Sequence, residues 1–183
     1  MTTATKILLG TGAFFAALYL LQSSRRSSVL QQGQQRPFNA DDARAALQVV
    51  KQRYGTAMAK RIEQVARLES THFQSAQYKA TGTGGMEAHG APPFYGWYSP
   101  FFIANPTYTP VGTIDFTENG TGLTKTFVIM PSVEAWMMFL ADYATRYANQ
   151  GGILRWYSTN AQAQANYANS LNQISTPFVN SFA

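Results

Sequence analysis

Residues 56–73 read TAMAKRIEQVARLESTHF, and the predicted fold is built outward from this segment. Its apolar residues recur at helical offsets of 0, 3, 4 and 11, as Ile62, Val65, Ala66 and Phe73. This spacing predicts a helix from about Thr56 to His72 with one buried face. Glu69 occupies offset 7 on the same face. Because burial disfavours the charged form of a carboxyl group, we expect a raised pKa for Glu69, which suits a general acid.

Glu63, on the same predicted helix, has different neighbours. It has Lys60 three residues before it and Arg67 four residues after it, so we expect an ordinary solvated ion pair. Glu69 has no basic residue at either spacing, and only His72 follows it at i+3. The alternative for a glutamate on an apolar face is a purely structural role.

The remaining elements complete an α+β pattern of helices around one small hairpin. In chain order we first expect a helix capped at Asn39 and ended by Gly55, then the helix 56–72 and structured loops over 82–110. Two strands, at 113–117 and 123–130, should follow around the turn 118–122. A helix from Ser132 to Gly151 and a last helix over 160–174, ended by Pro177, complete the chain. The helix after Ser132 has one apolar stripe, formed by Val133, Trp136, Met137, Leu140, Ala144 and Tyr147.

The N-terminal segment predicts a membrane anchor. Residues 7–21 (ILLGTGAFFAALYLL) are uncharged and apolar, and as a helix they span about 22 Å. Lys6 can snorkel and bring the span close to bilayer thickness. A cleaved signal peptide is the alternative, but no A-x-A-like site follows and Arg25-Arg26 comes directly after the apolar run. We therefore expect a single-pass anchor over 1–21, in either orientation.

A flexible tether and one domain follow the anchor. Residues 22–36 are rich in Ser and Gln, which indicates a tether, and the domain is expected to cover 37–183. Four of the 14 basic residues lie before residue 37, where no acidic residue occurs, so ten basic residues remain against nine acidic ones. The domain thus lacks the basic footprint of a nucleic-acid binder, and the basic N-terminal segment favours an anionic lipid membrane.

Composition excludes several chemistries. The chain has no cysteine and two histidines, so a thiol nucleophile is absent and a zinc site has few nitrogen or sulfur ligands. A Ser-His-Asp triad lacks its G-x-S-x-G elbow. The Gly-rich segment Gly82–Met86 has no lysine after it and is not a phosphate loop. Either carboxylate chemistry without metal or cofactor remains, or the chain has no chemistry.

Two segments resemble the lysozyme superfamily. Glu69–Phe73 (ESTHF), followed by Gly82–Met86 (GTGGM), is similar to lytic transglycosylases and glucosaminidases, in which the catalytic Glu ends a helix as Glu-Ser and a Gly-rich turn follows. Phe127–Trp136, Trp156–Asn160 and Tyr167–Leu171 resemble the glucosaminidase family, which is mannosyl-glycoprotein endo-β-N-acetylglucosaminidase-like. Together these segments cover about residues 40–176. The chain departs from the family at Asn160, where an Asp is usual, and over 87–126, which does not align clearly.

The resemblance implies a lysozyme-like fold that cleaves peptidoglycan glycan strands, with Glu69 as the acid. A hydrolase of this kind needs a second carboxylate, and Asp115 and Glu118 on the predicted hairpin are the leading candidates, with Glu87 and lastly Asp142 behind them. Glu118 is alternatively a solvated turn residue. A lytic transglycosylase needs no second acid, since the 6-hydroxyl of the sugar attacks. Both mechanisms stay open, with hydrolysis slightly favoured by the C-terminal resemblance.

Further side chains are candidates for holding the sugar. Tyr95, Trp97 and Tyr98 could stack on sugar faces, or they could fold into the core. Tyr157 matches the family's closing tyrosine, which implies that it orients the sugar or Glu69; the alternative is a core tyrosine. His72 is a candidate for substrate binding beside Glu69, or a structural hydrogen bonder.

These expectations describe a membrane-tethered peptidoglycan-cleaving enzyme. Such an enzyme suits a bacterial envelope, or the internal membrane of a lipid-containing bacteriophage. The rival from another class is a non-catalytic lysozyme-like module that binds glycan or a partner protein at the membrane.

Overall fold

The computed structural model describes residues 36–88, 99–117 and 122–182, so the expected anchor and most of the tether lie outside the described residues. The chain divides into two units between Arg36 and Pro37, and the second unit holds helices and one two-stranded antiparallel sheet. The predicted α+β class is confirmed. None of the helices within the described ranges has both the length and the apolar character needed to cross a bilayer.

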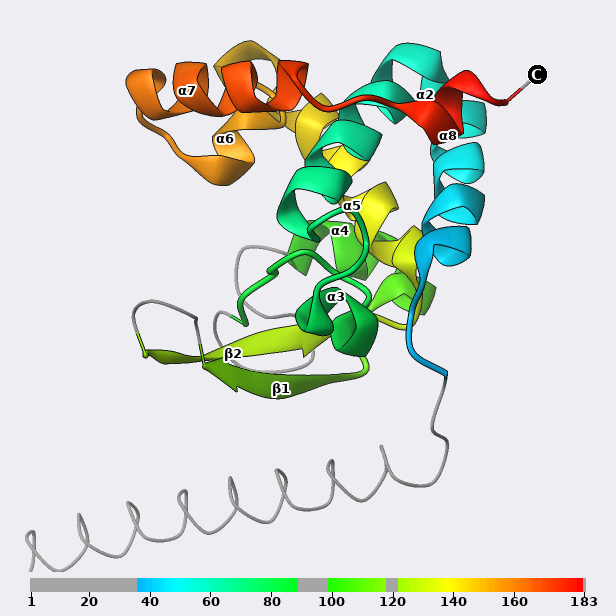
Figure 1. Ribbon diagram of the computed structural model, residues 1–183, viewed down its shortest axis with the longest axis vertical. Helices are drawn as coiled ribbons and strands as arrows, with labels where there is room; N and C mark the ends of the chain where they lie inside the picture. Colours follow the sequence, from blue (N-terminus) through cyan, green and yellow to red (C-terminus); the bar gives the residue numbers. More distant parts are fainter. Residues whose placement is uncertain (1–35, 89–98, 118–121, 183) are drawn as a thin grey trace, which may run out of the picture. The chain divides into compact units, whose positions relative to one another are not determined.

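The first long helix, α2 (Ala40–Glu69), consists of two halves that run in different directions (Figure 1). The break is at Gly55, whose φ of 85° and ψ of 167° are far from helical values. The N-terminus has the predicted cap: the Asn39 side chain accepts from the backbone N–H groups of Asp41 and Asp42, and the Asp42 carboxylate accepts from the Asn39 N–H. The predicted helix start and the break at Gly55 are both confirmed.

Helix α5 (Val133–Arg146) is the central helix of the core. The Ser132 hydroxyl accepts from the Ala135 N–H at 3.1 Å, as a predicted N-cap should. Every residue from Ala135 to Ala141 is buried, rather than one stripe alone. The helix packs along α2, and the Trp136 ring lies against the Tyr78 ring with centroids 6.4 Å apart. A helix that is buried on nearly all sides needs apolar residues all around it, which Met138 and Phe139 supply.

The two predicted strands are confirmed as β1 (Gly112–Thr117) and β2 (Thr124–Ile129). They pair antiparallel, with Gly112 opposite Ile129 and Thr117 opposite Thr124. The segment 86–88 pairs with the other edge of β2. There the Val128 N–H donates to the Met86 carbonyl at 3.0 Å, and the Ala88 N–H donates to the Thr126 carbonyl at 2.8 Å. This segment continues the sheet on the side away from β1.

Shorter helices connect these elements. They are α3 (Ala76–Thr81), α4 (Ser99–Ala104), η2 (Pro106–Tyr108), η3 (Ala148–Gln150), α6 (Leu154–Tyr157), α7 (Ala161–Asn172) and α8 (Pro177–Asn180). Within the predicted loop region, α4 and η2 are therefore helical, while 89–98 lie outside the described residues. Pro177 was expected to follow the last helix, but it occupies the first turn of α8. Proline is compatible with that position because the N–H it lacks would have no helical partner there.

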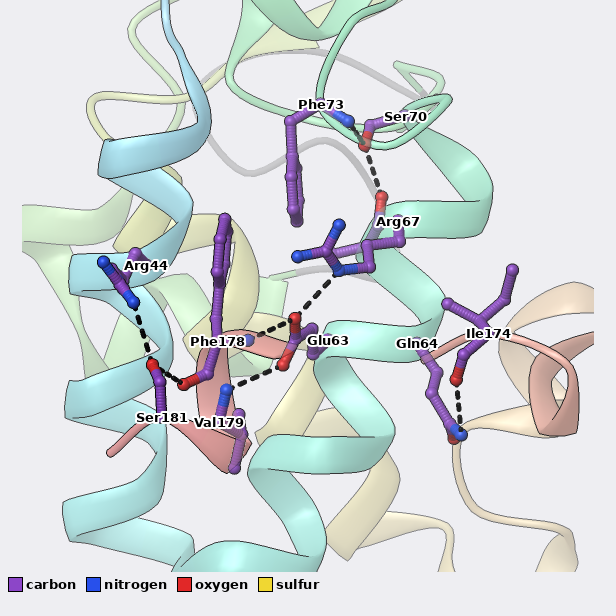
Figure 2. Close-up of polar contacts among 11 residues, drawn as sticks. Arg44, Glu63, Gln64, Arg67, Ser70, Phe73, Ile174, Phe178, Val179 and Ser181 are labelled. Carbon is purple, nitrogen blue, oxygen red and sulfur yellow. Dashed lines mark hydrogen bonds and ion pairs between the residues drawn. The ribbon is translucent and has the colours of Figure 1, made fainter. Parts of the chain in front are cut away.

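The prediction of a solvated Glu63 is wrong. Glu63 does pair with Arg67, at 2.8 Å, but its side chain is 0% exposed. The backbone N–H groups of Phe178 and Val179 also donate to its carboxylate (Figure 2). The chain returns more than 100 residues later to cover this face of α2, and local spacing gives no sign of that return.

Residues 37–182 contain their own buried core, so we expect deletion of residues 1–36 to leave a folded, near-neutral domain. Circular dichroism of the truncated protein should show helical signal, and thermal or urea unfolding should be a single cooperative transition. The control is the full chain under the same conditions. Absence of a cooperative transition in the truncated protein would show that the N-terminal segment contributes to the core.

Candidate active site

Glu69 lies at the C-terminal end of α2, with its side chain only partly exposed. The hydroxyl of Tyr167, on α7, donates a hydrogen bond of 2.5 Å to the Glu69 carboxylate. Burial raises the pKa of Glu69, and the hydrogen bond from Tyr167 opposes part of that rise. This is the direction that the apolar face of residues 56–73 predicts. The site therefore holds a carboxyl group that keeps its proton to higher pH than an exposed one.

Tyr167 joins Glu69 to an exposed aromatic ring. Its ring stacks on that of Tyr157, with centroids 4.4 Å apart and planes 1° from parallel. Tyr157 is 57% exposed, whereas Tyr167 is 5% exposed. Burial, followed by the charge of Glu69, raises the pKa of Tyr167 above its usual range, so its hydroxyl remains a donor. The tyrosine that contacts Glu69 is thus Tyr167, and Tyr157 lies behind it.

Sequence reasoning named the segment around Tyr167 but gave this residue no role. A signal was present: Tyr167 and Leu171 are four residues apart, and they are the buried residues of the otherwise polar α7. A buried tyrosine on such a helix needs a hydrogen-bond partner for its hydroxyl. The partner could not be identified, because Glu69 is 98 residues away in the chain.

The chain turns sharply directly after Glu69. Thr71, His72 and Phe73 have φ values of 51°, 55° and 69°, the left-handed region that non-glycine residues avoid. We call residues 71–73 the left-handed turn. Ser70 supports it, because its hydroxyl donates to the Ala66 carbonyl at 2.5 Å and accepts from the Phe73 N–H at 2.8 Å. The helix therefore ends at Glu69 rather than at His72 as predicted, and His72 is an exposed residue of the turn.

The Gly-rich segment 82–85 packs directly on Glu69. A Cβ atom built on Gly84 would lie 2.5 Å from the Cβ of Glu69 and 2.9 Å from its carbonyl carbon. No side chain fits in that space, so glycine is required where the backbone approaches the end of α2. Two residues later the chain pairs with β2 through Met86. Segment 82–88 thus connects the surroundings of Glu69 to the sheet.

Asp115 lies on β1, opposite Thr126, whose hydroxyl donates to its carboxylate at 2.6 Å. Alternate residues of a strand face the same side, so Asp115 shares its face of the sheet with the pair Thr113 and Val128. Val128 is fully buried and Asp115 is exposed. One end of this face therefore packs on the core, and its other end is a polar surface open to solvent.

The other predicted residues are placed as follows. Glu87 pairs with Lys125 at 2.7 Å, on the opposite face of the sheet from Asp115, and Asp142 pairs with Arg146 on α5 at 2.8 Å. Tyr95, Trp97, Tyr98 and Glu118 lie outside the described residues. Within the described ranges, no group of three or more His, Cys, Asp or Glu side chains could hold a metal ion.

The described site thus combines one partly buried carboxyl group, a tyrosine donor and an exposed aromatic ring. These features define a candidate acid site at the end of a helix, in an α+β domain. Comparisons with models of protein families, with curated proteins and with solved structures found no match to the chain. The functional assignment therefore rests on the residues of this chain.

The raised pKa of Glu69 predicts a pH-dependent stability difference. The ionised carboxylate is disfavoured in the folded state, so the contribution of Glu69 to stability should be lost as the pH rises from below the usual carboxyl pKa through the raised one. Glu69→Gln cannot ionise, so its free energy of unfolding relative to wild type should be higher at pH 7 than at pH 3.5. Urea unfolding at both pH values measures this difference.

The comparison variant is Tyr167→Phe. Removing its hydroxyl deletes the hydrogen bond that favours the ionised form of Glu69, so the pKa of Glu69 should rise further. The pH range over which the stability contribution of Glu69 is lost should then extend to higher pH. If the relative stability of Glu69→Gln does not change with pH, then Glu69 is not desolvated in the folded protein.

Proposed function

We propose that this chain cleaves the glycan strands of peptidoglycan through a lysozyme-like domain, with Glu69 as the general acid that protonates the glycosidic oxygen. The observation that carries the proposal is the environment of Glu69: a partly buried carboxyl group whose pKa is raised by burial, held by one tyrosine hydroxyl. A glycosidase acid needs to be protonated near neutral pH, and burial is the usual means of achieving this.

The local architecture supports the lysozyme-like assignment. The helix ends at Glu69-Ser70, the Gly-rich segment packs against the glutamate, and a small antiparallel hairpin is connected to it through residues 82–88. The first two of these features belong to the segments on which the sequence resemblance rests. Each has a physical role here, since Ser70 supports the left-handed turn and Gly84 allows the close backbone approach.

We assign sugar contacts to four groups of residues in this proposal. The exposed Tyr157 ring can pack against the apolar face of a sugar, with Tyr167 as its fixed support. Tyr95, Trp97 and Tyr98 are proposed as further stacking residues, and His72 as a polar contact from the left-handed turn. The polar end of the hairpin face, with Asp115 and its threonine neighbours, can hydrogen-bond sugar hydroxyls.

The cleavage reaction has two candidate routes, which differ in the group that attacks the sugar. In hydrolysis, Asp115 or Glu118 activates water or stabilises the positive charge on the sugar, and Glu69 donates the proton. In lytic transglycosylation, Glu69 first donates its proton to the leaving oxygen, and its carboxylate then takes the proton of the sugar's 6-hydroxyl as that oxygen bonds to C1. We slightly favour hydrolysis, because the C-terminal segments of the chain resemble the glucosaminidases.

We propose that the apolar segment 7–21 anchors the domain in a membrane. A single-pass anchor with a short tether would keep the domain close to the cell wall, either in a bacterial envelope or in the internal membrane of a bacteriophage. The second candidate function is a non-catalytic module that binds glycan strands at the same membrane. The exposed Tyr157 ring suits either function, so the chemistry of Glu69 distinguishes them.

Glu69→Gln should keep the fold and lose at least about 10²-fold in glycan cleavage, because it preserves shape but removes the proton donor. The assay is release of soluble fragments from purified peptidoglycan sacculi. The matched control is Glu134→Gln, since Glu134 also accepts a 2.5 Å hydrogen bond from a tyrosine, Tyr108, but lies on a different helix, α5. If Glu69→Gln keeps wild-type cleavage, Glu69 is structural; if wild type releases nothing but binds sacculi, the module is non-catalytic.

The reducing ends of the products should separate the two routes. If water is the nucleophile, mass spectrometry should find ordinary reducing ends, and Asp115→Asn or Glu118→Gln should lower kcat by about 10²-fold or more. Because the Thr126 hydroxyl can still donate to the amide oxygen of the replacement side chain, Asp115→Asn should remain folded. Fragments that end in 1,6-anhydro-muramic acid, with both variants fully active, would show that the sugar's own hydroxyl attacks and that hydrolysis is the wrong route.

A further inference from the structure

The last residues that the structure describes are hydrogen-bonded to a buried carboxylate, that of Glu63. Residues 176–182, which we call the C-terminal clasp, contain the four-residue helix α8. No side-chain hydrogen bond from Thr176 caps this helix; the Glu63 carboxylate accepts from the N–H groups of Phe178 and Val179 at 3.1 and 2.9 Å instead (Figure 2). A four-residue helix has little stability of its own, so Glu63 of α2 determines where the clasp forms.

The clasp connects the two halves of α2. From the first half, Arg44 donates to the Ser181 hydroxyl at 2.8 Å, and Lys51 donates to the Phe182 carbonyl at 3.2 Å. From the second half come the contacts of Glu63 and the Arg67 guanidinium, whose carbon lies 4.5 Å from the centroid of the Phe178 ring. Since the helix is interrupted at Gly55, these contacts help to set the angle between the two halves.

The clasp also reaches the left-handed turn behind Glu69. The Phe178 ring stacks on the Phe73 ring, with centroids 5.8 Å apart and planes 9° from parallel. The Arg67 guanidinium also lies over Phe73, at 5.1 Å, so it contacts both rings. Phe73 is 1% exposed and ends a turn that is unfavourable in isolation, so these contacts contribute to keeping the turn in place.

Two routes lead from Phe73 to Glu69. The first is Ser70, the direct neighbour of Glu69, whose hydroxyl accepts from the Phe73 N–H. The second is Tyr78 of α3, whose ring lies 5.4 Å from that of Phe73; α3 leads into Gly84, which packs on the Glu69 Cβ. Phe73 is therefore linked to Glu69 through Ser70 and through the segment that holds Gly84.

We propose that the C-terminal clasp positions the carboxyl group of Glu69, with Phe178 as the positioning residue that acts through Phe73 and the left-handed turn. The kinetic part of this inference rests on the proposed function of Glu69; the placement of its carboxyl group does not. Phe178 itself touches neither substrate nor Glu69 in this assignment. It holds the partly buried, Tyr167-bonded arrangement that makes Glu69 a useful acid.

The test is Phe178→Ala in the full-length chain, with Phe182→Ala as the matched control. Both variants remove a phenylalanine ring from the clasp, but Phe182 packs beside Lys51 of the first half of α2, whereas Phe178 stacks on Phe73. In Phe178→Ala the NMR titration midpoint of the Glu69 carboxyl carbon should fall towards that of an exposed glutamate. In soluble glycan cleavage, kcat should fall about ten- to a hundredfold with little change in KM. Phe182→Ala should leave all three values unchanged.

Phe178→Tyr keeps the ring and should restore both kcat and the midpoint. If Phe178→Ala does not fold, Phe178→Leu, which keeps apolar bulk without a ring, is measured in the same way. A Glu69 midpoint identical to wild type in the folded variant would overturn the inference and leave the clasp as a purely stabilising element. Because the titration needs no enzymatic activity, it gives this answer even if Glu69→Gln shows that the protein is not an enzyme.

Discussion

Three consecutive non-glycine residues in the left-handed region, residues 71–73, constrain everything around Glu69. They end α2, reverse the chain, and lead through α3 to Gly84, which packs back on the glutamate. Such a conformation is unfavourable by itself, so other contacts must hold it. Ser70 holds the turn from inside by hydrogen bonds, and Phe178 holds it from outside through Phe73.

Two glutamates on the second half of α2 have contrasting surroundings. Glu63 is completely buried but receives hydrogen bonds from Arg67 and from two backbone N–H groups, so its oxygens are well partnered and it is part of the scaffold. Glu69 has the hydroxyl of Tyr167, and desolvation dominates its pKa. The less compensated carboxyl group is the one suited to exchange a proton.

The C-terminal clasp combines stability with placement. Its contacts with Arg44, Lys51 and Glu63 join both halves of a helix that Gly55 interrupts, and its Phe178 ring adjoins the turn behind the candidate acid. Contacts of this kind make the geometry of a site depend on residues far from it, because packed side chains transmit displacement rather than absorb it. The geometry of the proposed active site thus depends on Phe178, which lies more than 100 residues after Glu69 in the chain.

The sequence by itself determined the features that arise from short spacings. The cap at Asn39, the break at Gly55, the two strands, the Ser132 cap and the buried face that carries Glu69 all follow from residues within a few positions of one another. The tertiary structure alone decided that Glu63 is buried, that Pro177 begins a helix, and that Tyr167 rather than Tyr157 contacts Glu69. The Glu63 and Tyr167 contacts join residues 98 to 116 positions apart, and a contact at that separation leaves no periodic pattern in the sequence.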